Sequence, residues 1–281
     1  MTFFVNQRSN FYAMTKAFLL AVLLFLAKNV MSQSPFYPGD TLYVWAKSGL
    51  NMRESNSKES KKISAIPFGA QVVALEYSSG IEYSVVISKR RTLFENTSHP
   101  VKAPEFAIRG NWLKVKFDNK EGYVSDIYLS SLPVPKVEFF EQVMQQTGKS
   151  LEFVELKETP REYLGRIFGQ NKVIETNKTM NPESVTTLVL YKNGASYRRE
   201  IWGSAGAVET IIIPEISMNE GYLLFNLMFN YEVHASNQTY KEIYPLEVEE
   251  LTWRFNTGEP EGETTLTKVG GFFIMTWFYH C

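Results

Sequence analysis

Short segments in which apolar and polar residues alternate recur along most of this chain, and glycine, proline or asparagine turns separate them. Alternation with a period of two places one set of side chains on one face of a β-strand. The clearest case is the pair 185–192 and 195–202, because Asn193-Gly194 between them is typical of a type I′ hairpin turn. We therefore expect a mainly β protein built from antiparallel strands.

The N-terminal residues have the composition of an export signal. Residues 1–32 contain no acid and three bases, and residues 17–27 form an uninterrupted apolar run. This run is too short to span a bilayer, which takes about 20 residues. With Lys16 before it, the run is typical of a signal peptide, and small residues predict cleavage between Ser32 and Gln33. We expect a secreted or periplasmic protein with no stable membrane span after cleavage; an uncleaved amphipathic anchor is the alternative.

The charge of the chain is balanced overall but uneven along its length. Lys+Arg is 29 and Asp+Glu is 30, so no basic excess points to a nucleic-acid partner. Residues 38–133 carry 13 bases and 10 acids, whereas residues 136–281 carry 13 bases and 20 acids. The change falls at Leu132-Pro133-Val134-Pro135, where both prolines favour extended backbone. We therefore place a domain boundary near 133–136, with the second domain at 137–281.

The first domain, residues 38–133, consists of short strands at close spacing, which is typical of a small barrel. Between two of these strands, residues 77–109 form an insertion that we expect to be a loop, and loops of this length are usually functional or disordered. The predicted strands lie at 41–46, 50–53, 63–66, 71–76, 111–117 and 121–125.

Five short motifs in this domain follow one another in the order and spacing of the bacterial SH3-like (SH3b) domain. They are Leu50-Asn51-Met52-Arg53, Ile66-Pro67-Phe68-Gly69, Gly110-Asn111-Trp112-Leu113-Lys114-Val115, Lys120-Glu121-Gly122-Tyr123-Val124 and Tyr128-Leu129. The chain resembles that family over about residues 40–131. The resemblance implies a non-catalytic domain that binds cell-wall peptides or protein partners. The 77–109 insertion departs from the family, which usually has a short hairpin there.

A barrel this small has no interior room for a substrate, so a ligand has to bind in a groove on its surface. Aromatic side chains suit such a groove because they offer a large contact area at low entropic cost. We favour a barrel-core position for Trp112 and Tyr123. The candidate ligand-binding residues are Tyr43, Trp45, Trp112, Tyr123 and Tyr128.

The second domain begins with two predicted short helices and continues as antiparallel strands. Residues 137–146 have apolar residues at helical spacing, and Thr159-Pro160 is typical of a helix start, with the helix ending near Phe168. Six or seven strands then imply a β-sandwich or meander. We place them at 185–192, 195–202, 208–213, 221–234, 251–256, 263–269 and 272–279.

Residues suited to catalysis or metal binding are scarce. The one cysteine is the last residue, Cys281, and the histidines His99, His234 and His280 have no metal-ligand spacing. No glycine-rich phosphate loop, dinucleotide fingerprint or nucleophile motif is present. We therefore predict no catalytic residue, no metal site and no cofactor.

These features together predict an exported, non-enzymatic bacterial binding protein whose SH3-like domain contacts a cell-wall peptide or a protein partner. One alternative is a cell-envelope hydrolase with a glutamate-based site in the second domain. Another is an inhibitor or immunity-type protein whose acidic second domain covers a basic enzyme. The glutamates that the hydrolase would use are Glu247, Glu249, Glu250, Glu259, Glu261 and Glu263.

Overall fold

The computed structural model of the chain describes most of the residues after the predicted signal peptide. The described residues all belong to one compact unit, Phe36–Cys281, which is mainly β. The predicted signal peptide, its predicted cleavage site, the cysteine and the three histidines lie outside them. Neither α-helix in the described part is long and apolar enough to cross a membrane. The described ranges are 36–93, 100–143, 150–178, 184–202, 206–229, 244–256 and 262–279.

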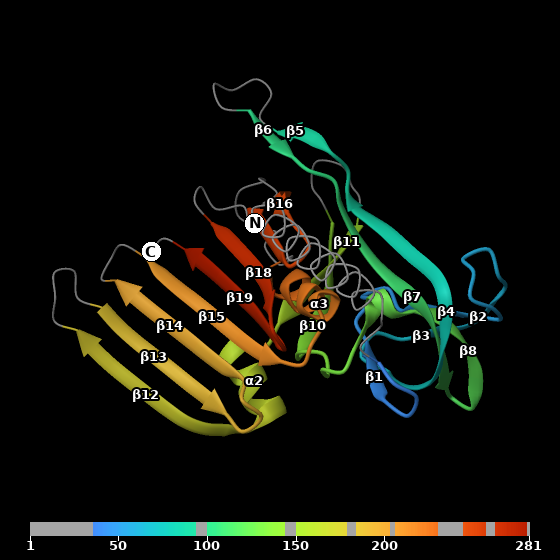
Figure 1. Cartoon of the computed structure of the whole chain (residues 1–281), viewed down its shortest axis with the longest axis horizontal. Helices are drawn as coiled ribbons and strands as arrows, with labels where there is room; N and C mark the ends of the chain where they lie inside the picture. The colour runs from blue at the N-terminus through green and yellow to red at the C-terminus, as the bar shows by residue number, and fades with distance from the viewer. Residues whose placement is uncertain are drawn as a thin grey trace, which may run out of the picture. The chain divides into compact units, whose positions relative to one another are not determined.

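The first half of this unit is a curled, half-barrel sheet of seven strands (Figure 1). Its strands are β1 (Thr41–Val44), β2 (Leu50–Arg53), β3 (Lys62–Ile66), β4 (Gln71–Ser88), β7 (Phe106–Phe117), β8 (Lys120–Ser125) and β9 (Leu129–Ser130). They pair in the order β3-β2-β8-β7-β4-β1-β9. All six strands predicted here are confirmed, and alternate side chains fill the interior because a strand has two faces.

Residues 77–109 were expected to be a loop, and this expectation is wrong. Strands β4 and β7 continue as a pair as far as Ser88 and Phe106. Beyond them β5 (Arg91–Leu93) pairs with β6 (Val101–Ala103), so the insertion is a long β arm (Figure 1). The pairing register of β4 with β7 shifts between Tyr77 and Glu82. The turn-like residues between them therefore form an irregularity inside a continuing strand and do not end it.

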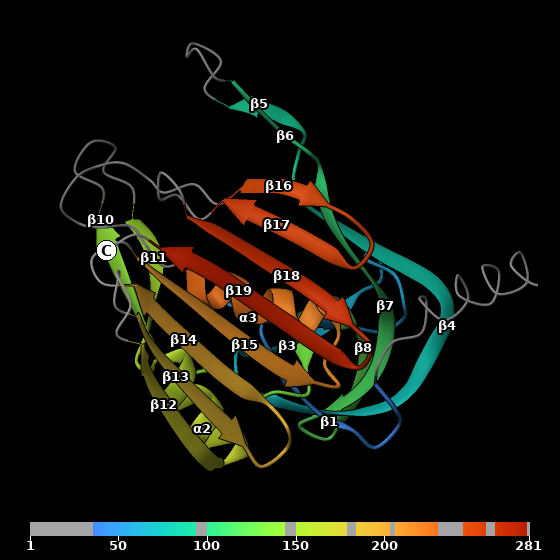
Figure 2. The ribbon, with the colours of Figure 1, turned by 60° about the vertical axis from the view of Figure 1, so that its left-hand side comes forward.

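The second half is one sheet of eight antiparallel strands. They are β12 (Gln170–Lys178), β13 (Ser184–Tyr191), β14 (Ser196–Trp202), β15 (Ala207–Pro214), β16 (Tyr244–Val248), β17 (Thr252–Asn256), β18 (Glu263–Val269) and β19 (Phe272–Tyr279). The order β12-β13-β14-β15-β19-β18-β17-β16 joins two four-stranded meanders at β15 and β19 (Figure 2). Of the two predicted forms, the meander is therefore the one that occurs.

The hairpin of β13 and β14 is confirmed, but its turn is not type I′. That turn requires positive φ at both central residues. Of the pair Asn193-Gly194 only Gly194 has positive φ, at 87°, and Tyr191 N donates to Ala195 O at 3.0 Å to close a wider loop. The turn with two left-handed residues lies instead between β7 and β8, at Asp118 (φ 47°) and Asn119 (φ 59°).

In the second half, one segment predicted as a helix is a strand, and one segment predicted as a strand is a helix. Residues 137–146 were expected to be helical, but β10 (Val137–Val143) is a strand paired with β11 (Ser150–Leu156). Residues 221–234 were expected to be a strand, but α3 (Met218–Phe229) is a helix. Both segments are short and rich in apolar residues, and periodicity alone does not separate a buried helix from a strand in such cases.

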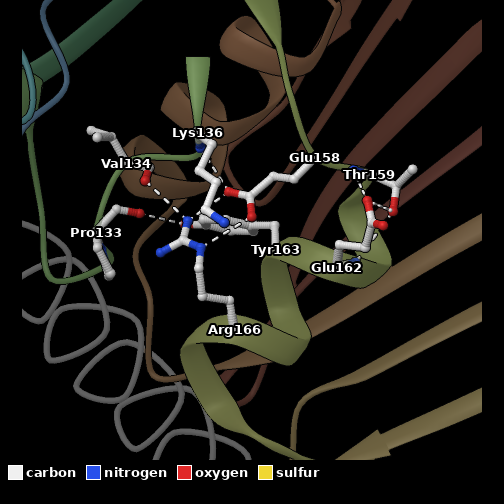
Figure 3. Close-up of polar contacts among 8 residues, drawn as sticks. All are labelled: Pro133, Val134, Lys136, Glu158, Thr159, Glu162, Tyr163 and Arg166. Atoms are coloured by element: carbon white, nitrogen blue, oxygen red, sulfur yellow. Dashed lines mark hydrogen bonds and ion pairs between the residues drawn. The ribbon is translucent and has the colours of Figure 1, made fainter.

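The helix predicted at 160–168 is confirmed as α2 (Pro160–Phe168). Thr159 Oγ1 accepts from Glu162 N at 3.3 Å, and Glu162 Oε2 accepts from Thr159 N at 2.8 Å (Figure 3). This reciprocal capping box satisfies two amide groups that have no partner inside the helix. Pro160 at the first helical position loses nothing by lacking an N–H.

Helix α2 also holds the proline segment that joins the two halves (Figure 3). Tyr163 Oη donates to Pro133 O at 2.9 Å, and Arg166 Nη2 donates to Val134 O at 3.2 Å. The buried Glu158 carboxylate accepts from Lys136 N at 2.7 Å and from Arg166 Nη2 at 2.6 Å. These hydrogen bonds hold the proline segment against α2 and Glu158.

One hydrophobic core extends across this segment. The half-barrel contributes Trp45, Phe106, Ile108, Ile127 and Leu132, and the rest comes from α2, α3 and the second sheet. Helix α3 contacts β18, β19 and the short 3₁₀ helix η1 (Asp126–Tyr128). The two halves therefore share buried apolar surface, which is the main stabilising contribution to a fold.

A buried carboxylate completes the junction between the halves. Glu220, which is 1% exposed, lies in the first turn of α3. Its Oε1 accepts from Ser130 Oγ at 3.0 Å and from Ser131 N at 2.8 Å, and its Oε2 accepts from Ser217 N at 2.9 Å. The same side chain thus caps the helix and binds the end of the half-barrel.

Candidate functional site

A groove with a volume of about 620 Å³ lies where the half-barrel meets α3 and β10. The half-barrel contributes the stretch from Trp45 to Asn51 together with side chains of β7, β8 and η1. The arm contributes Tyr83 and Ile87, β10 contributes Phe139, and α3 contributes Tyr222, Leu223 and Asn226. The groove is therefore built by segments far apart in the sequence.

Aromatic rings make up much of the groove lining. Tyr83 and Trp112 pack edge to face, with ring centroids 5.3 Å apart. Trp45 is anchored because its Nε1 donates to Leu132 O at 2.9 Å. Burial raises the pKa of Tyr128, and the neighbouring Tyr83 raises it further. Rigid rings of this kind are typical of binding surfaces.

The structure brings together three of the five predicted binding residues. Trp45, Trp112 and Tyr128 line the groove, whereas Tyr43 and Tyr123 do not. The Tyr43 hydroxyl instead accepts from Gln71 Nε2 at 3.0 Å.

Trp112 is buried, with 4% of its surface exposed, as expected of a core residue, but neither it nor the half-buried Tyr123 fills the barrel. Neither side chain belongs to the cluster of buried residues inside the half-barrel, which contains their neighbours Leu113 and Val124. Adjacent residues of a strand point to opposite faces, so Trp112 lies outside the barrel, on the side of the groove.

Tyr83, Phe139 and Tyr222 line the groove but were missed by the sequence analysis. Each lies in a segment whose structure was predicted wrongly: the arm, β10 and α3 respectively. The available sequence signal was the alternation of apolar and polar residues at Tyr83-Ser84-Val85. This alternation is typical of a β-strand, and in the structure these residues pair with β7.

Three basic residues also line the groove, and no Asp or Glu is among its described lining residues. The bases are Lys47, Arg53 and Lys58. Arg53 Nη1 donates to Ser60 O, a backbone group of the neighbouring loop. Ser125, which also lines the groove, has a buried hydroxyl without a hydrogen-bond partner in the described part of the chain.

The described glutamates that were considered for a hydrolase do not line this groove. Glu247 and Glu263 both bind Arg254, at 2.9 Å and 2.8 Å. The hydrogen bonds from Arg254 lower the pKa of Glu263, whereas a general acid needs a raised one. Glu249 and Glu250 are exposed, Glu259 and Glu261 lie outside the described residues, and no acid-rich metal cluster occurs within those residues.

An aromatic groove that also carries cations can hold a ligand that combines an apolar or flat surface with negative charge. Its described lining offers Tyr and Ser hydroxyls, an Asn amide and bases, which are hydrogen-bond and charge partners for a bound molecule. Comparison of the chain with models of known protein families, with curated proteins and with solved structures found no match.

Proposed function

We propose that this protein is an exported, non-enzymatic binding protein, and that residues 38–133 form an SH3-like domain that contacts a cell-wall peptide. The acid-free N-terminus with its apolar run supports export. The five motifs and the curled sheet support the SH3-like assignment.

The observation that carries this proposal is the aromatic groove. Trp45, Trp112 and Tyr128 come from the SH3-like part, and Tyr83 packs against Trp112 beside them. Aromatic side chains in a groove supply most of the energy in many peptide-binding sites. The pairing of Glu247 and Glu263 with Arg254 favours binding over a glutamate-based hydrolysis, because both carboxylates are held as structural ion pairs.

The test is retention of the mature chain, residues 33–281, on purified peptidoglycan. We expect the unaltered chain to bind and Tyr83→Ala to bind about tenfold more weakly, since one buried aromatic contact contributes on the order of 1–2 kcal/mol. Phe272→Ala is the matched control, because Phe272 is exposed on β19 and does not line the groove. Lack of retention of the unaltered chain would show that the wall is not its ligand and would direct the search to a protein partner.

A further inference from the structure

The Lys47 ammonium group in the groove has no negatively charged partner among the described residues. Lys58 is paired with Glu59 at 3.9 Å, and Arg53 donates to Ser60 O. For Lys47 the structure shows no hydrogen bond or ion pair with any described residue. A partly buried ammonium group without a partner gains more from an incoming anion than a fully solvated one does.

The backbone fixes the place of this lysine. Gly49 N donates to Ala46 O at 2.8 Å, which closes a tight turn around Lys47. Gly49 has φ 81°, and a Cβ there would lie 2.9 Å from Ile66 O, so only glycine fits. Burial lowers the pKa of Lys47, so its charged form is solvated less well here than in water.

We infer that the groove holds its ligand by a peptide carboxylate, which Lys47 and Arg53 bind while the aromatic side chains contact the rest of the peptide. This inference rests on the proposed function and specifies the chemistry of the wall peptide. An arginine guanidinium matches a carboxylate with two parallel hydrogen bonds, and a lysine adds a point charge.

A carboxylate fits this groove better than a phosphate polymer does. Proteins that bind polyphosphates present many bases along an extended track, and their binding falls steeply with salt. Here three bases share the groove with rings such as Tyr83, Trp112 and Phe139. A few charges beside aromatic rings in one groove are typical of sites for short peptides with an acidic group.

The test compares two probes in titrations of the mature chain followed by tryptophan fluorescence, since Trp45 and Trp112 line the groove. One probe is a peptidoglycan stem peptide with a free C-terminal carboxylate and the other is the same peptide as its C-terminal amide. We expect the acid to bind about tenfold more tightly, which corresponds to about 1.4 kcal/mol. Lys47→Gln should remove most of this difference by weakening the acid only, and Lys47→Arg should keep it.

Lys116→Gln is the matched control, because Lys116 is exposed on β7 and does not line the groove. Equal affinity for acid and amide would overturn the carboxylate inference, while a loss of both on Tyr83→Ala would keep the groove as the peptide site. Displacement of the acid by inorganic phosphate at matched ionic strength would also overturn it in favour of a phosphate site. Binding of neither probe would overturn the inference and the proposed wall-peptide function together.

Discussion

At the scale of single residues, the pair Glu158 and Arg166 joins a buried carboxylate to a guanidinium through two hydrogen bonds. The Glu158 side chain is 4% exposed, and Arg166 Nε and Nη2 donate to it at 3.0 Å and 2.6 Å. Burial by itself would raise the pKa of the Glu158 carboxyl, but hydrogen bonds from Arg166 and Lys136 N outweigh it, so the pKa lies below its ordinary value. We expect Glu158→Gln to reduce the free energy of unfolding by about 2 kcal/mol at neutral pH, because charge-assisted hydrogen bonds are lost.

The pH dependence of this effect has a definite sign. The pKa of the Glu158 carboxyl is lower in the folded chain than the value of about 4.3 expected when it is unfolded. Its contribution to stability is therefore complete above that pH and is lost as the pH falls through the folded value. Urea unfolding should show the Gln variant and the unaltered chain converging in acid. A difference that stays constant with pH would show that packing, not charge, accounts for the loss.

Single residues also show what the sequence could predict of the groove. Trp45, Trp112 and Tyr128 were predicted because they lie within or near the motifs that resemble those of an SH3b domain. Tyr83 and Tyr222 were not, because their place depends on a partner strand and on a helix packed from the other half of the chain. Local patterns report which residues share a strand face, whereas a groove between segments depends on long-range packing.

At the scale of elements, α2 and α3 each contain a glycine, and we expect replacement by alanine to have opposite effects on stability at the two sites. A Cβ on Gly221 in α3 would lie 2.1 Å from the ring of Phe273, whereas a Cβ on Gly165 in α2 would meet Tyr191 at 3.9 Å, an ordinary contact. Helix propensity favours alanine over glycine by about 1 kcal/mol at both sites. We expect Gly165→Ala to raise the free energy of unfolding by 0.5–1 kcal/mol, roughly, and Gly221→Ala to lower it by about 1–3 kcal/mol through overpacking. Chemical denaturation measures both, and a stabilising Gly221→Ala would contradict the close packing of α3 on β19.

The same two helices mark what sequence patterns could predict at this scale. Helix α2 was predicted because Thr159 and Pro160 are local signals that need no partner. Helix α3 was predicted as a strand because it is apolar on most sides, and a helix of that kind is recognisable only once both of its neighbours are known. The strands from β13 to β15 and from β17 to β19 were predicted because each of them pairs with a neighbour in sequence.

At the scale of the whole molecule, the shared core makes the half-barrel dependent on the second half. The ring centroid of Phe106 on β7 lies 5.1 Å from that of Tyr222, 5.0 Å from that of Trp253 and 5.2 Å from that of Phe255. These three rings come from the second half. Burial of one aromatic side chain removes roughly 150–250 Å² of surface from water. Removing the second half would expose Phe106 together with Trp45, Ile108 and Ile127, which belong to the same core.

We therefore expect the fragment 33–136 not to fold cooperatively on its own, whereas the chain 33–281 unfolds in one transition that is the same by fluorescence and circular dichroism. In the longer chain Phe106→Ala should lower the free energy of unfolding by about 3–5 kcal/mol, since it leaves a cavity at the shared core. A fragment with a sharp transition of its own would contradict this dependence and would establish the predicted boundary near 133–136 as a boundary between independently folding domains. The fragment also lacks the side of the groove formed by Tyr222, Leu223 and Asn226, so even a folded fragment should bind the proposed wall-peptide ligand more weakly than the longer chain.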